Sequence, residues 1–566
     1  MGRKSIVGIC LVVLFLAGCS SSKEVTTPEA VPTSAPVPAE VNQEEKVDDA
    51  VSEAEEEDVL DYWMHLNGDD GAYVGIDTKR AYESVLEGKQ PQQTVLVAVI
   101  DSGVDIEHED IPVWKNEDEI AGNGIDDDNN GYVDDVHGWN FIGGADGDNV
   151  YYDTFEVTRE YARLHPIYED VDASTLSGEE EEAYAYYKEI VAAFDEEVAF
   201  MKEIFENINT AVGLLDAANS IMGDFLGGEF TMDQVKAVES DREEINQAKS
   251  ILLYFDDAGF DKEELIEERE TYVSYLEKGL NPEFDPRAIV GDNYSDSSEK
   301  IYGNNDVTGP DAFHGTHVAG IIAAKRGNNL GIDGIASSVE IMAVRAVPKG
   351  DERDKDIANA IQYAVDNGAD IINMSFGKGF SPQKDVVDDA IQYAEANNVL
   401  MIHAAGNDGE NNDNSRNYPT ANLSDSEGKV STWIEVGASS WEGPQQLAAS
   451  FSNFGRQNVD VFAPGVDIYS TTPGNEYKHS DGTSMASPVV AGLAALVMAY
   501  YPDFSAAEVK DIILDSASSY ADLMVTKPGT EGELVAFGIL SRTGSIINAY
   551  SALKLAEERA KGDSMQ

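Results

Sequence analysis

Cysteine is nearly absent from this sequence. Cys10 and Cys19 are its only two cysteines, and both lie close to the N-terminus, around an apolar run over residues 6–16 that follows basic residues. This pattern is typical of a secretion signal that is removed after export. If the chain is cut before Cys19, a single thiol remains and no intrachain disulfide can form. Stability must then come from packing, with bound metal ions as a further source.

Basic residues are also scarce. Lys and Arg number 38 against 106 Asp and Glu, which gives a net charge of −68 at pH 7. This field would repel nucleic acid and an anionic membrane surface, so we expect neither as a partner. Solvation of the surface explains the acidity most simply, and a halophilic habitat is the alternative. The 566 residues leave room for about two to four domains.

The residues before Cys19 read Leu-Ala-Gly, which resembles a bacterial lipobox. We therefore expect residues 1–18 to be a signal peptide and Cys19 to carry a lipid anchor in the membrane. The alternative is an ordinary signal peptide with a chance cysteine. Residues 19–57 lack aromatic residues and are rich in Ser, Thr, Pro, Ala and Glu, which predicts a disordered tether. Ser20 resembles outer-membrane sorting patterns, so the expected location is the outer membrane of a bacterial cell envelope.

Short apolar, β-rich runs alternate with helical patterns from Thr94 onward. This alternation predicts an α/β fold, a parallel sheet with helices on both faces. Residues 58–150 and 281–566, which ends in helices, are expected to form the two parts of this domain. The predicted strands are residues 95–100, 340–347, 370–374, 399–403 and 434–438, and the predicted helices between them are residues 354–367 and 384–397.

Three motifs carry candidate catalytic residues. An apolar run ends in Asp101 of the motif DSG, His314 opens the motif HGTHVAG, and Ser484 of GTSMASP begins a nearly uncharged helix. A serine hydroxyl is a weak nucleophile unless a base takes its proton and an acid orients that base. The order Asp, His, Ser is one of the three known chain orders of such a triad. The helix start also offers free backbone N–H groups to an oxyanion.

These motifs, together with AAGN at residues 404–407, resemble those of the subtilase family of serine peptidases. The resemblance implies a subtilisin-like fold and a serine endopeptidase that hydrolyses proteins or peptides through an acyl-enzyme. It assigns the triad to Asp101, His314 and Ser484, and the oxyanion site to Asn407 and the Ser484 backbone N–H.

The resemblance also implies two walls of a substrate cleft. One wall, which pairs with the substrate backbone as an added strand, is Ser375, Phe376 and Gly377. The other, which lines the pocket for the side chain before the scissile bond, is Ala404, Ala405 and Gly406. The small residues of the second wall favour room for a sizeable apolar side chain.

A calcium site is predicted in residues 124–135, which read GIDDDNNGYVDD. Acidic and amide residues at alternate positions before a glycine resemble the start of an EF-hand loop. The twelfth position is histidine rather than glutamate, so another residue must close the site. The alternative is a surface turn rich in Asp and Asn. The predicted Ca²⁺ ligands are Asp126, Asp128, Asn130, Tyr132 and Asp134.

Residues 151–280 interrupt the α/β pattern and are predicted to be an acidic helical insertion. Apolar residues recur at three- and four-residue steps from Tyr187 to Ile208 and from Val235 to Phe255, and a third helix follows around residues 265–276. We expect the first two stripes to pack against each other. Because the insertion lies between Asp101 and His314 in the chain, we expect it beside the catalytic face, where it limits access by bulky substrates.

Two other classes of function remain open. A degenerate peptidase fold that recruits a partner would be a binding protein, but all the expected catalytic residues are present. A lipase or esterase requires a G-x-S-x-G elbow and the order Ser, Asp, His, whereas the serine comes last here.

His314 and His317 at a three-residue spacing could bind zinc, but no third ligand follows. The natural substrate and the oligomeric state are not determined by the sequence.

Overall fold

The computed structural model describes residues 60–67, 73–424 and 428–563. The predicted signal peptide, Cys19 and the tether up to residue 57 lie outside the described residues. The chain divides into two compact units, of which the first contains residues 61–205 and 266–563 and the second contains residues 206–265. This division lies inside the predicted insertion, so both ends of the insertion belong to the first unit.

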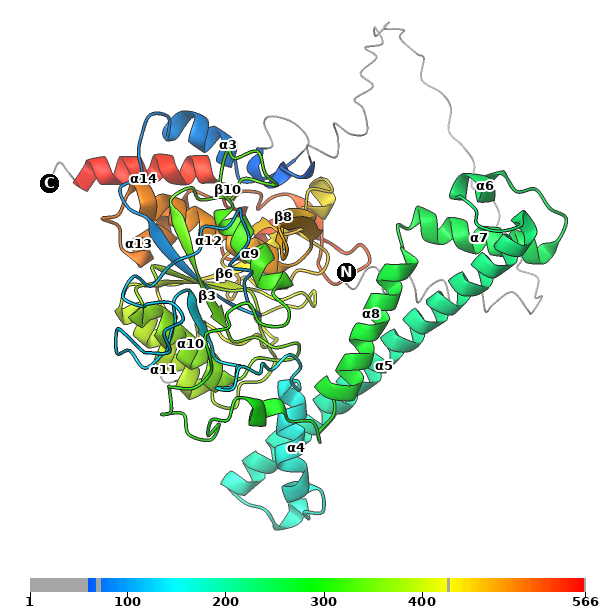
Figure 1. Ribbon diagram of the computed structural model, residues 1–566, viewed down its shortest axis with the longest axis horizontal. Helices are drawn as coiled ribbons and strands as arrows, with labels where there is room; N and C mark the ends of the chain where they lie inside the picture. Colours follow the sequence, from blue (N-terminus) through cyan, green and yellow to red (C-terminus); the bar gives the residue numbers. More distant parts are fainter. Residues whose placement is uncertain (1–59, 68–72, 425–427, 564–566) are drawn as a thin grey trace, which may run out of the picture. The chain divides into compact units, whose positions relative to one another are not determined.

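A nine-stranded sheet forms the centre of the first unit (Figure 1). Within the described residues every neighbouring pair is parallel except β10 with β13. The predicted α/β fold with a parallel sheet is therefore confirmed. In sheet order the strands are β10 (Ser518–Ser519), β13 (Ser545–Ile546), β7 (Val461–Pro464), β6 (Trp433–Ser439), β5 (Leu400–Ala404), β4 (Ile371–Met374), β1 (Val95–Asp101), β3 (Val339–Arg345) and β2 (Gly138–Asn140).

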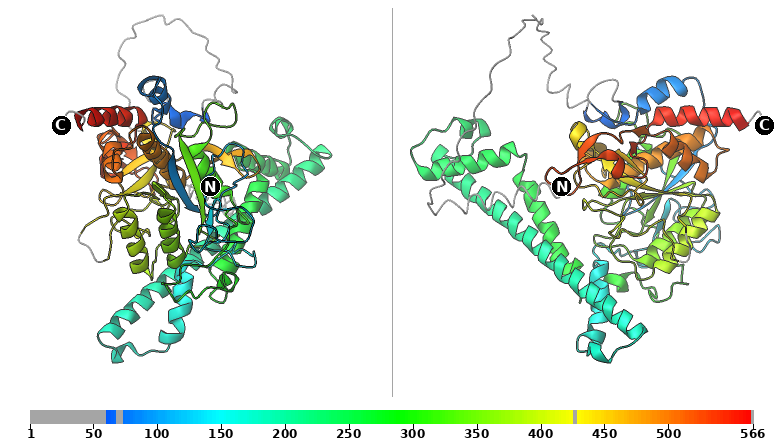
Figure 2. Two further views of the ribbon diagram at one scale, coloured as in Figure 1. Left: turned by 60° about the vertical axis from the view of Figure 1, so that its left-hand side comes forward. Right: turned by 180° about the vertical axis from the view of Figure 1, so that it is seen from behind.

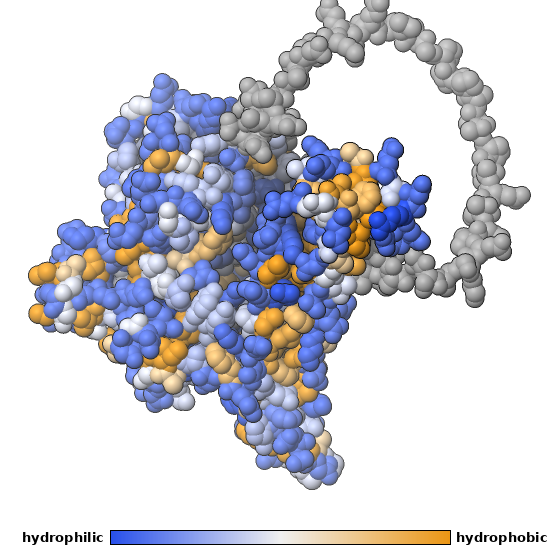
Figure 3. Space-filling view, turned by 45° about the vertical axis from the view of Figure 1, so that its right-hand side comes forward, coloured by the Kyte–Doolittle hydropathy of each residue, from blue (hydrophilic) through white to orange (hydrophobic). Residues whose placement is uncertain are grey.

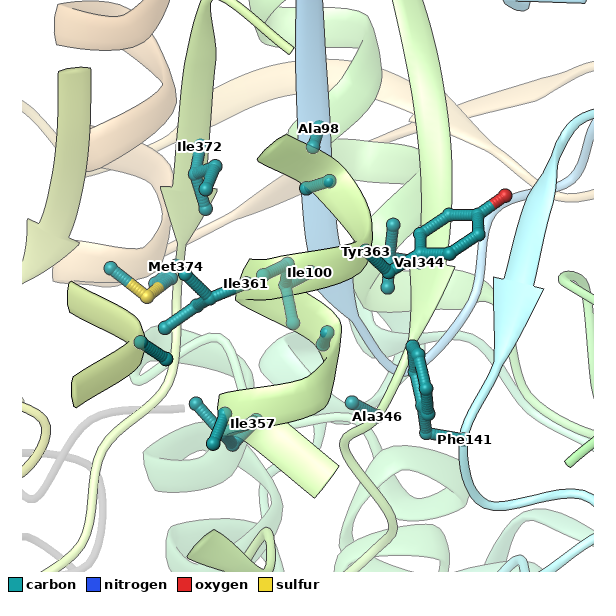
Figure 4. Packing of buried hydrophobic residues seen from close by; sticks show 14 of the residues in the cluster. Ala98, Ile100, Phe141, Val344, Ala346, Ile357, Ile361, Tyr363, Ile372 and Met374 are labelled. Atoms are coloured by element: carbon teal, nitrogen blue, oxygen red, sulfur yellow. The ribbon is translucent and has the colours of Figure 1, made fainter. Parts of the chain in front are cut away.

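Helices cover both faces of this sheet. On one face, Ile357 and Ile361 of α10 (Asp354–Asp366) pack over Ala98 and Ile100 of β1 (Figure 4), and α11 (Lys384–Ala396) lies beside α10. The other face is covered by α9 (Phe313–Ala323) and α12 (Thr483–Tyr500). Because successive side chains of a strand point to opposite faces, strands buried on both sides read as continuous apolar runs.

Helix α12 is the central helix of the second face. By length and composition it could cross a membrane, yet 94% of its apolar stretch is buried inside the protein. It contacts β4, β5, β6 and β7 as well as α9. A helix that is apolar on all sides is expected where it is enclosed by other elements, and this enclosure holds the start of α12 in a fixed place beside the strand ends.

The remaining elements of the first unit complete the ends of the sheet. The N-terminal helix α3 lies beside the C-terminal helix α14 in both views of Figure 2. Two small antiparallel hairpins pair β8 with β9 and β11 with β12. The bounds are α3 (Thr78–Arg80), α13 (Ala506–Asp515), α14 (Ala549–Asp563), β8 (Ile468–Thr472), β9 (Glu476–Ser480), β11 (Met524–Thr526) and β12 (Leu534–Ala536).

The insertion is helical, as predicted, but its first stripe has a different partner. Tyr187 and Phe194 pack with Leu164 and Val157 of a helix that the sequence pattern did not indicate, and Phe380 of the catalytic part joins the same clusters. The first part of the stripe therefore anchors the insertion to the sheet domain. The helices are α4 (Glu156–Tyr168), α5 (Glu179–Leu226), α6 (Met232–Ala237), α7 (Glu243–Asp257) and α8 (Lys262–Ser274).

The second unit has a small core of its own. Val235 of α6 is buried together with Ile245, Leu252 and Phe255 of α7. Lys236 and Asp256 form an ion pair of 3.0 Å between the two helices. The predicted second stripe thus falls on two helices that are separated by a break after Ala237.

The face seen in Figure 3 is largely hydrophilic, in keeping with the net charge, but several carboxylates are buried. Four of these buried carboxylates lie against a buried cation. Burial of a carboxylate without such a partner would be costly in free energy. The pairs are Asp356 with Arg287 at 2.6 Å, Asp153 with Arg353 at 2.7 Å, Asp292 with Lys355 at 2.7 Å and Glu156 with Lys378 at 2.7 Å.

We predict that Ile361→Ala destabilises the first unit by about 2–5 kcal/mol, because it leaves a cavity between α10 and the sheet. Ile167→Ala is the matched control, since Ile167 is also helical but 57% exposed, whereas Ile361 is fully buried. The control should change stability by less than about 0.5 kcal/mol. Urea unfolding followed by tryptophan fluorescence measures both, and equal effects would contradict the packing described here.

Candidate active site

Asp101 and His314 meet at the carboxyl end of the sheet. Asp101 is the last residue of β1, and His314 lies in the first turn of α9. His314 Nδ1 lies 2.8 Å from Asp101 Oδ1, which also accepts a hydrogen bond from the Ser102 N–H at 2.7 Å. A Cβ at Gly315 would lie 2.1 Å from the Gly103 carbonyl oxygen. Glycine at position 315 therefore allows α9 to approach the end of β1 this closely.

The buried carboxylate controls the protonation of His314. Burial lowers the pKa of His314, but the charge of Asp101 and its hydrogen bond outweigh this effect, so the pKa lies above 6.5. With Nδ1 bonded to Asp101, the neutral ring has Nε2 as its proton acceptor. His317, by contrast, is buried with Nε2 2.9 Å from the Lys478 carbonyl, and burial lowers its pKa to about 4.

Ser484 is the second residue of α12 and lies beside the end of β4. Its Oγ donates to the Ser375 carbonyl at 3.1 Å, and Ser375 Oγ donates to the Ser484 carbonyl at 3.0 Å. Ser375 also lines a pocket of about 320 Å³ with Asp101 and His314. The three predicted triad residues therefore converge around Ser375.

Two N–H donors converge beside Ser484. A Cβ built on Gly482 would lie 3.4 Å from Ser484 N and 3.5 Å from Asn407 Nδ2, so both donors border the same space. Asn407 Oδ1 accepts hydrogen bonds from the N–H and the hydroxyl of Thr483, at 2.9 and 3.0 Å. These bonds fix the amide with its NH₂ group toward that space. An oxyanion held there would receive two hydrogen bonds.

The two predicted cleft walls follow neighbouring parallel strands. Residues 375–377 follow β4, and residues 404–406 lie at the end of β5. The backbones of Lys378 and Tyr418 pair at 2.9 and 3.1 Å, which joins the loops beyond the two walls. Asn417 Nδ2 donates to the Ala404 carbonyl at 3.0 Å, and its Oδ1 lies against Gly377. Asn417 therefore places a polar group between the walls. No sequence motif indicated Asn417 as a site residue.

The insertion also contributes to this region. Tyr151 and Tyr275, from its two ends, line the same pocket as His314. Lys378, directly after the first wall, is buried and bonds to Glu156 of α4 and to Asp354 of α10, each at 2.7 Å. These carboxylates hold the pKa of Lys378 above its usual range although burial lowers it. No local sequence pattern predicts this contact, because Glu156 and Lys378 are 222 residues apart.

Hydrogen bonds between residues of the predicted calcium loop and its neighbours hold the loop in shape. The Asp126 carboxylate accepts the N–H groups of Asn130 and Gly131 at 3.1 and 2.9 Å. The Asp134 carboxylate accepts those of Asn123 and Gly124 at 3.1 and 2.8 Å. Tyr132, which is predicted to offer its backbone carbonyl, has its ring buried against aromatic side chains of the core. Of the predicted carboxylate ligands, only Asp128 belongs to the acidic group that the structure brings together, with Glu119 and Asp135.

The comparisons with known proteins agree with this geometry. Residues 92–539 match the model of the subtilase family. The chain is 36% identical to subtilisin DY of Bacillus licheniformis over 254 residues, or 44% of this chain and 84% of the relative. It is 41% identical to a thermophilic serine proteinase of Bacillus sp. (strain AK1) over 229 residues, or 40% of this chain and 51% of that protein. The chain thus spans about half the length of that second relative.

Similarity to solved structures is partial. A protease from Pseudoalteromonas arctica matches with 28% identity and a TM-score of 0.37, covering 47% of this chain and 81% of that chain.

We predict that the two neighbouring histidines titrate far apart. NMR of ¹⁵N-histidine-labelled protein should give His314 a pKa above 6.5, while His317 stays neutral until about pH 4. Asp101→Asn removes the negative charge and should lower the pKa of His314 without moving that of His317. A His314 pKa that does not change in Asp101→Asn would contradict the assigned pair.

Proposed function

Because the chain belongs to the subtilase family, we propose that it is a serine endopeptidase that cleaves proteins or peptides through Asp101, His314 and Ser484. The observation that carries this proposal is the convergence of Asn407 Nδ2 and Ser484 N on one space beside the serine. The Asp101–His314 pair, which lines the adjacent pocket together with Ser375, supports it. A binding protein needs no such donors, and a lipase or esterase has its serine first in the chain order Ser, Asp, His, whereas Ser484 comes last here.

In the proposed reaction, Ser484 Oγ attacks the scissile carbonyl carbon while His314 Nε2 takes its proton. Asp101 holds Nδ1–H and stabilises the imidazolium that forms. The carbonyl oxygen becomes an oxyanion that accepts hydrogen bonds from Asn407 Nδ2 and Ser484 N. His314 then gives its proton to the leaving nitrogen, and the C–N bond breaks to leave an acyl-enzyme. Since neutral His314 is the base, the rate rises with pH through its pKa, which lies above 6.5.

The second half of the reaction repeats these steps with water. His314 takes a proton from the water molecule, which attacks the acyl carbon, and returns it to Ser484 Oγ as the ester bond breaks. Gly377 and Ala404 flank the substrate residue before the cut, with the Asn417 amide between them. A substrate side chain that can hydrogen-bond to this amide would therefore be accepted in addition to an apolar one.

We further propose a place and a cofactor for the enzyme. Lipidation of Cys19 would anchor it to the bacterial cell envelope, at the outer membrane, with residues 19–57 as a tether; the lipobox-like residues before Cys19 support this. Calcium is the proposed cofactor, supported by the acidic loop over residues 124–135. Neither nucleic acid nor another membrane contact is part of the proposal, given the net charge of −68.

The insertion is proposed to limit which substrates reach Ser484. Tyr151 and Tyr275 line the pocket beside His314, so the roots of the insertion border the path of the substrate chain. Glu156 also holds Lys378, which follows the wall formed by residues 375–377. Removing the whole insertion would therefore disturb the wall as well as open the cleft. The acidic surface would further disfavour acidic peptides.

We predict that Ser484→Ala lowers kcat for a fluorogenic peptide by about 10⁶-fold, a magnitude measured in subtilisin, without changing Tm. Asn407→Ala removes one oxyanion donor and should lower kcat by about 100- to 1,000-fold, also a subtilisin value. His317→Asn is the matched control, because His317 is a buried histidine of α9, the helix of His314, and its Nε2 bonds to the Lys478 carbonyl. It should lower Tm while kcat/KM stays within about tenfold. Residual activity of Ser484→Ala within tenfold of the parent would disprove the assignment.

We also predict that a Gly-Ser linker in place of residues 206–265 leaves cleavage of short peptides intact and changes the pattern of protein fragments. The first unit keeps its own core and the Glu156–Lys378 pair in this variant. Replacing residues 151–280 instead removes Glu156 and should lower Tm, because it removes one partner of a buried charge. Mass spectrometry of digests and thermal unfolding measure the two effects. An unchanged fragment pattern would rule out a gating role for residues 206–265.

A further inference from the structure

In the described part of the chain, Glu119, Asp128 and Asp135 form a carboxylate cluster that no basic side chain neutralises. One oxygen from each lies within 4.8 Å of the others. Glu119 and Asp135 are buried, with 4% and 0% exposure. Among the described residues no Lys, Arg or His side chain pairs with them, and the nearby Lys115 bonds to Glu117 instead. This differs from Asp153, Glu156, Asp292 and Asp356, each of which lies against a buried cation.

One oxygen of the cluster has no partner at all. Glu119 Oε1 accepts the N–H groups of Asp127 and Asp128 at 2.8 and 3.2 Å, which fixes the carboxylate in place. Glu119 Oε2 is buried and receives no hydrogen bond. An ionised oxygen buried in this way is strongly destabilising unless something positive lies against it.

The rest of the cluster is held by neutral groups. Asn116 Nδ2 donates to Asp128 at 3.0 Å and to Asp135 at 3.3 Å. Asn130 Nδ2 donates to the same two carboxylates at 3.0 and 3.1 Å. Tyr363 of α10 donates to Asp135 at 2.7 Å, which ties the loop to the helix that covers the sheet. These bonds orient the oxygens but leave the three negative charges uncompensated.

We propose that Glu119, Asp128 and Asp135 bind a divalent cation, and that the cation is Ca²⁺. An all-oxygen group without Cys or His favours a hard cation over zinc. Calcium lies about 2.3–2.6 Å from its ligands, so oxygens across one ion are separated by up to about 4.6–5.2 Å, which matches the observed spacing. The EF-hand-like spacing favours Asp126 and Asp134 as ligands. In the structure their carboxylates accept backbone N–H groups and so shape the loop.

The two ligand sets predict different behaviour for single substitutions. The test uses the full chain with Ser484→Ala, which prevents self-digestion and makes the result independent of the proposed peptidase activity. Thermal unfolding is measured in 1 mM CaCl₂ and in excess EDTA, and calcium titration calorimetry gives the stoichiometry. The variants are Glu119→Gln and Asp135→Asn, with Asp126→Asn and Asp134→Asn as matched controls in the same loop.

We expect Ca²⁺ to raise Tm of the parent chain by at least about 2 °C, because it binds only the folded loop. Glu119→Gln should abolish this calcium-dependent rise and remove one bound Ca²⁺ per chain. It should also raise Tm in EDTA, because it removes repulsion while its amide oxygen still accepts the N–H groups of Asp127 and Asp128. Asp126→Asn and Asp134→Asn should keep the calcium-dependent rise, whatever their effect on Tm in EDTA.

Two outcomes would overturn the proposal. One is a parent chain with the same Tm in calcium and in EDTA, and the other is a Glu119→Gln variant that keeps the full rise, alone or together with controls that lose it. The last combination would restore the ligand set suggested by the EF-hand spacing. If Glu119→Gln does not fold, Asp135→Asn provides the same comparison, since it also removes one charge of the cluster and retains an oxygen that can accept from Tyr363.

Discussion

Parallel pairing of β5, β4 and β1 is the constraint on which the site depends. These strands are consecutive in the sheet, and parallel strands end at the same edge. The edge therefore receives Asn407 just after β5, Ser375 after β4 and Asp101 at the end of β1. Helix α12 begins at this edge and adds Ser484, while the absence of a side chain at Gly482 leaves the space between the two N–H donors open. Groups of the proposed site from four distant parts of the chain are thus aligned by one sheet.

Charge is distributed unevenly between the surface and the interior. The chain has few basic residues, yet Arg287, Arg353, Lys355 and Lys378 are buried, each against at least one carboxylate. A buried pair contributes little net stability compared with an apolar contact, but loss of one partner costs about 3–5 kcal/mol. These cations therefore act as fixed links between elements. The acidic surface provides solvation, and the interior depends on local neutrality.

Local patterns in the sequence predicted most of the fold and the elements that carry the proposed site residues. Asp101 follows an apolar run, Ser484 opens an uncharged helix, and both features persist in β1 and α12. The sequence pattern did not predict helix α4, because the buried side of this helix is not apolar. It includes Glu156 and Glu160, each of which lies against an arginine three residues later. Asn417, Lys378 and Glu119 were missed for a related reason. Their environments arise from contacts across the fold, and no short motif encodes them.

The contact between Lys378 and Glu156 has a consequence for the history of this chain. An insertion that only decorated a loop could be gained or lost in one genetic event with little effect on the sheet domain. Here its first helix neutralises an ammonium group that stands next to the cleft wall. A chain without the insertion would retain Asp354 at 2.7 Å from this ammonium group but would lose its second carboxylate partner, Glu156. The two positions are therefore expected to have changed together, and the insertion has become part of the domain that it interrupts.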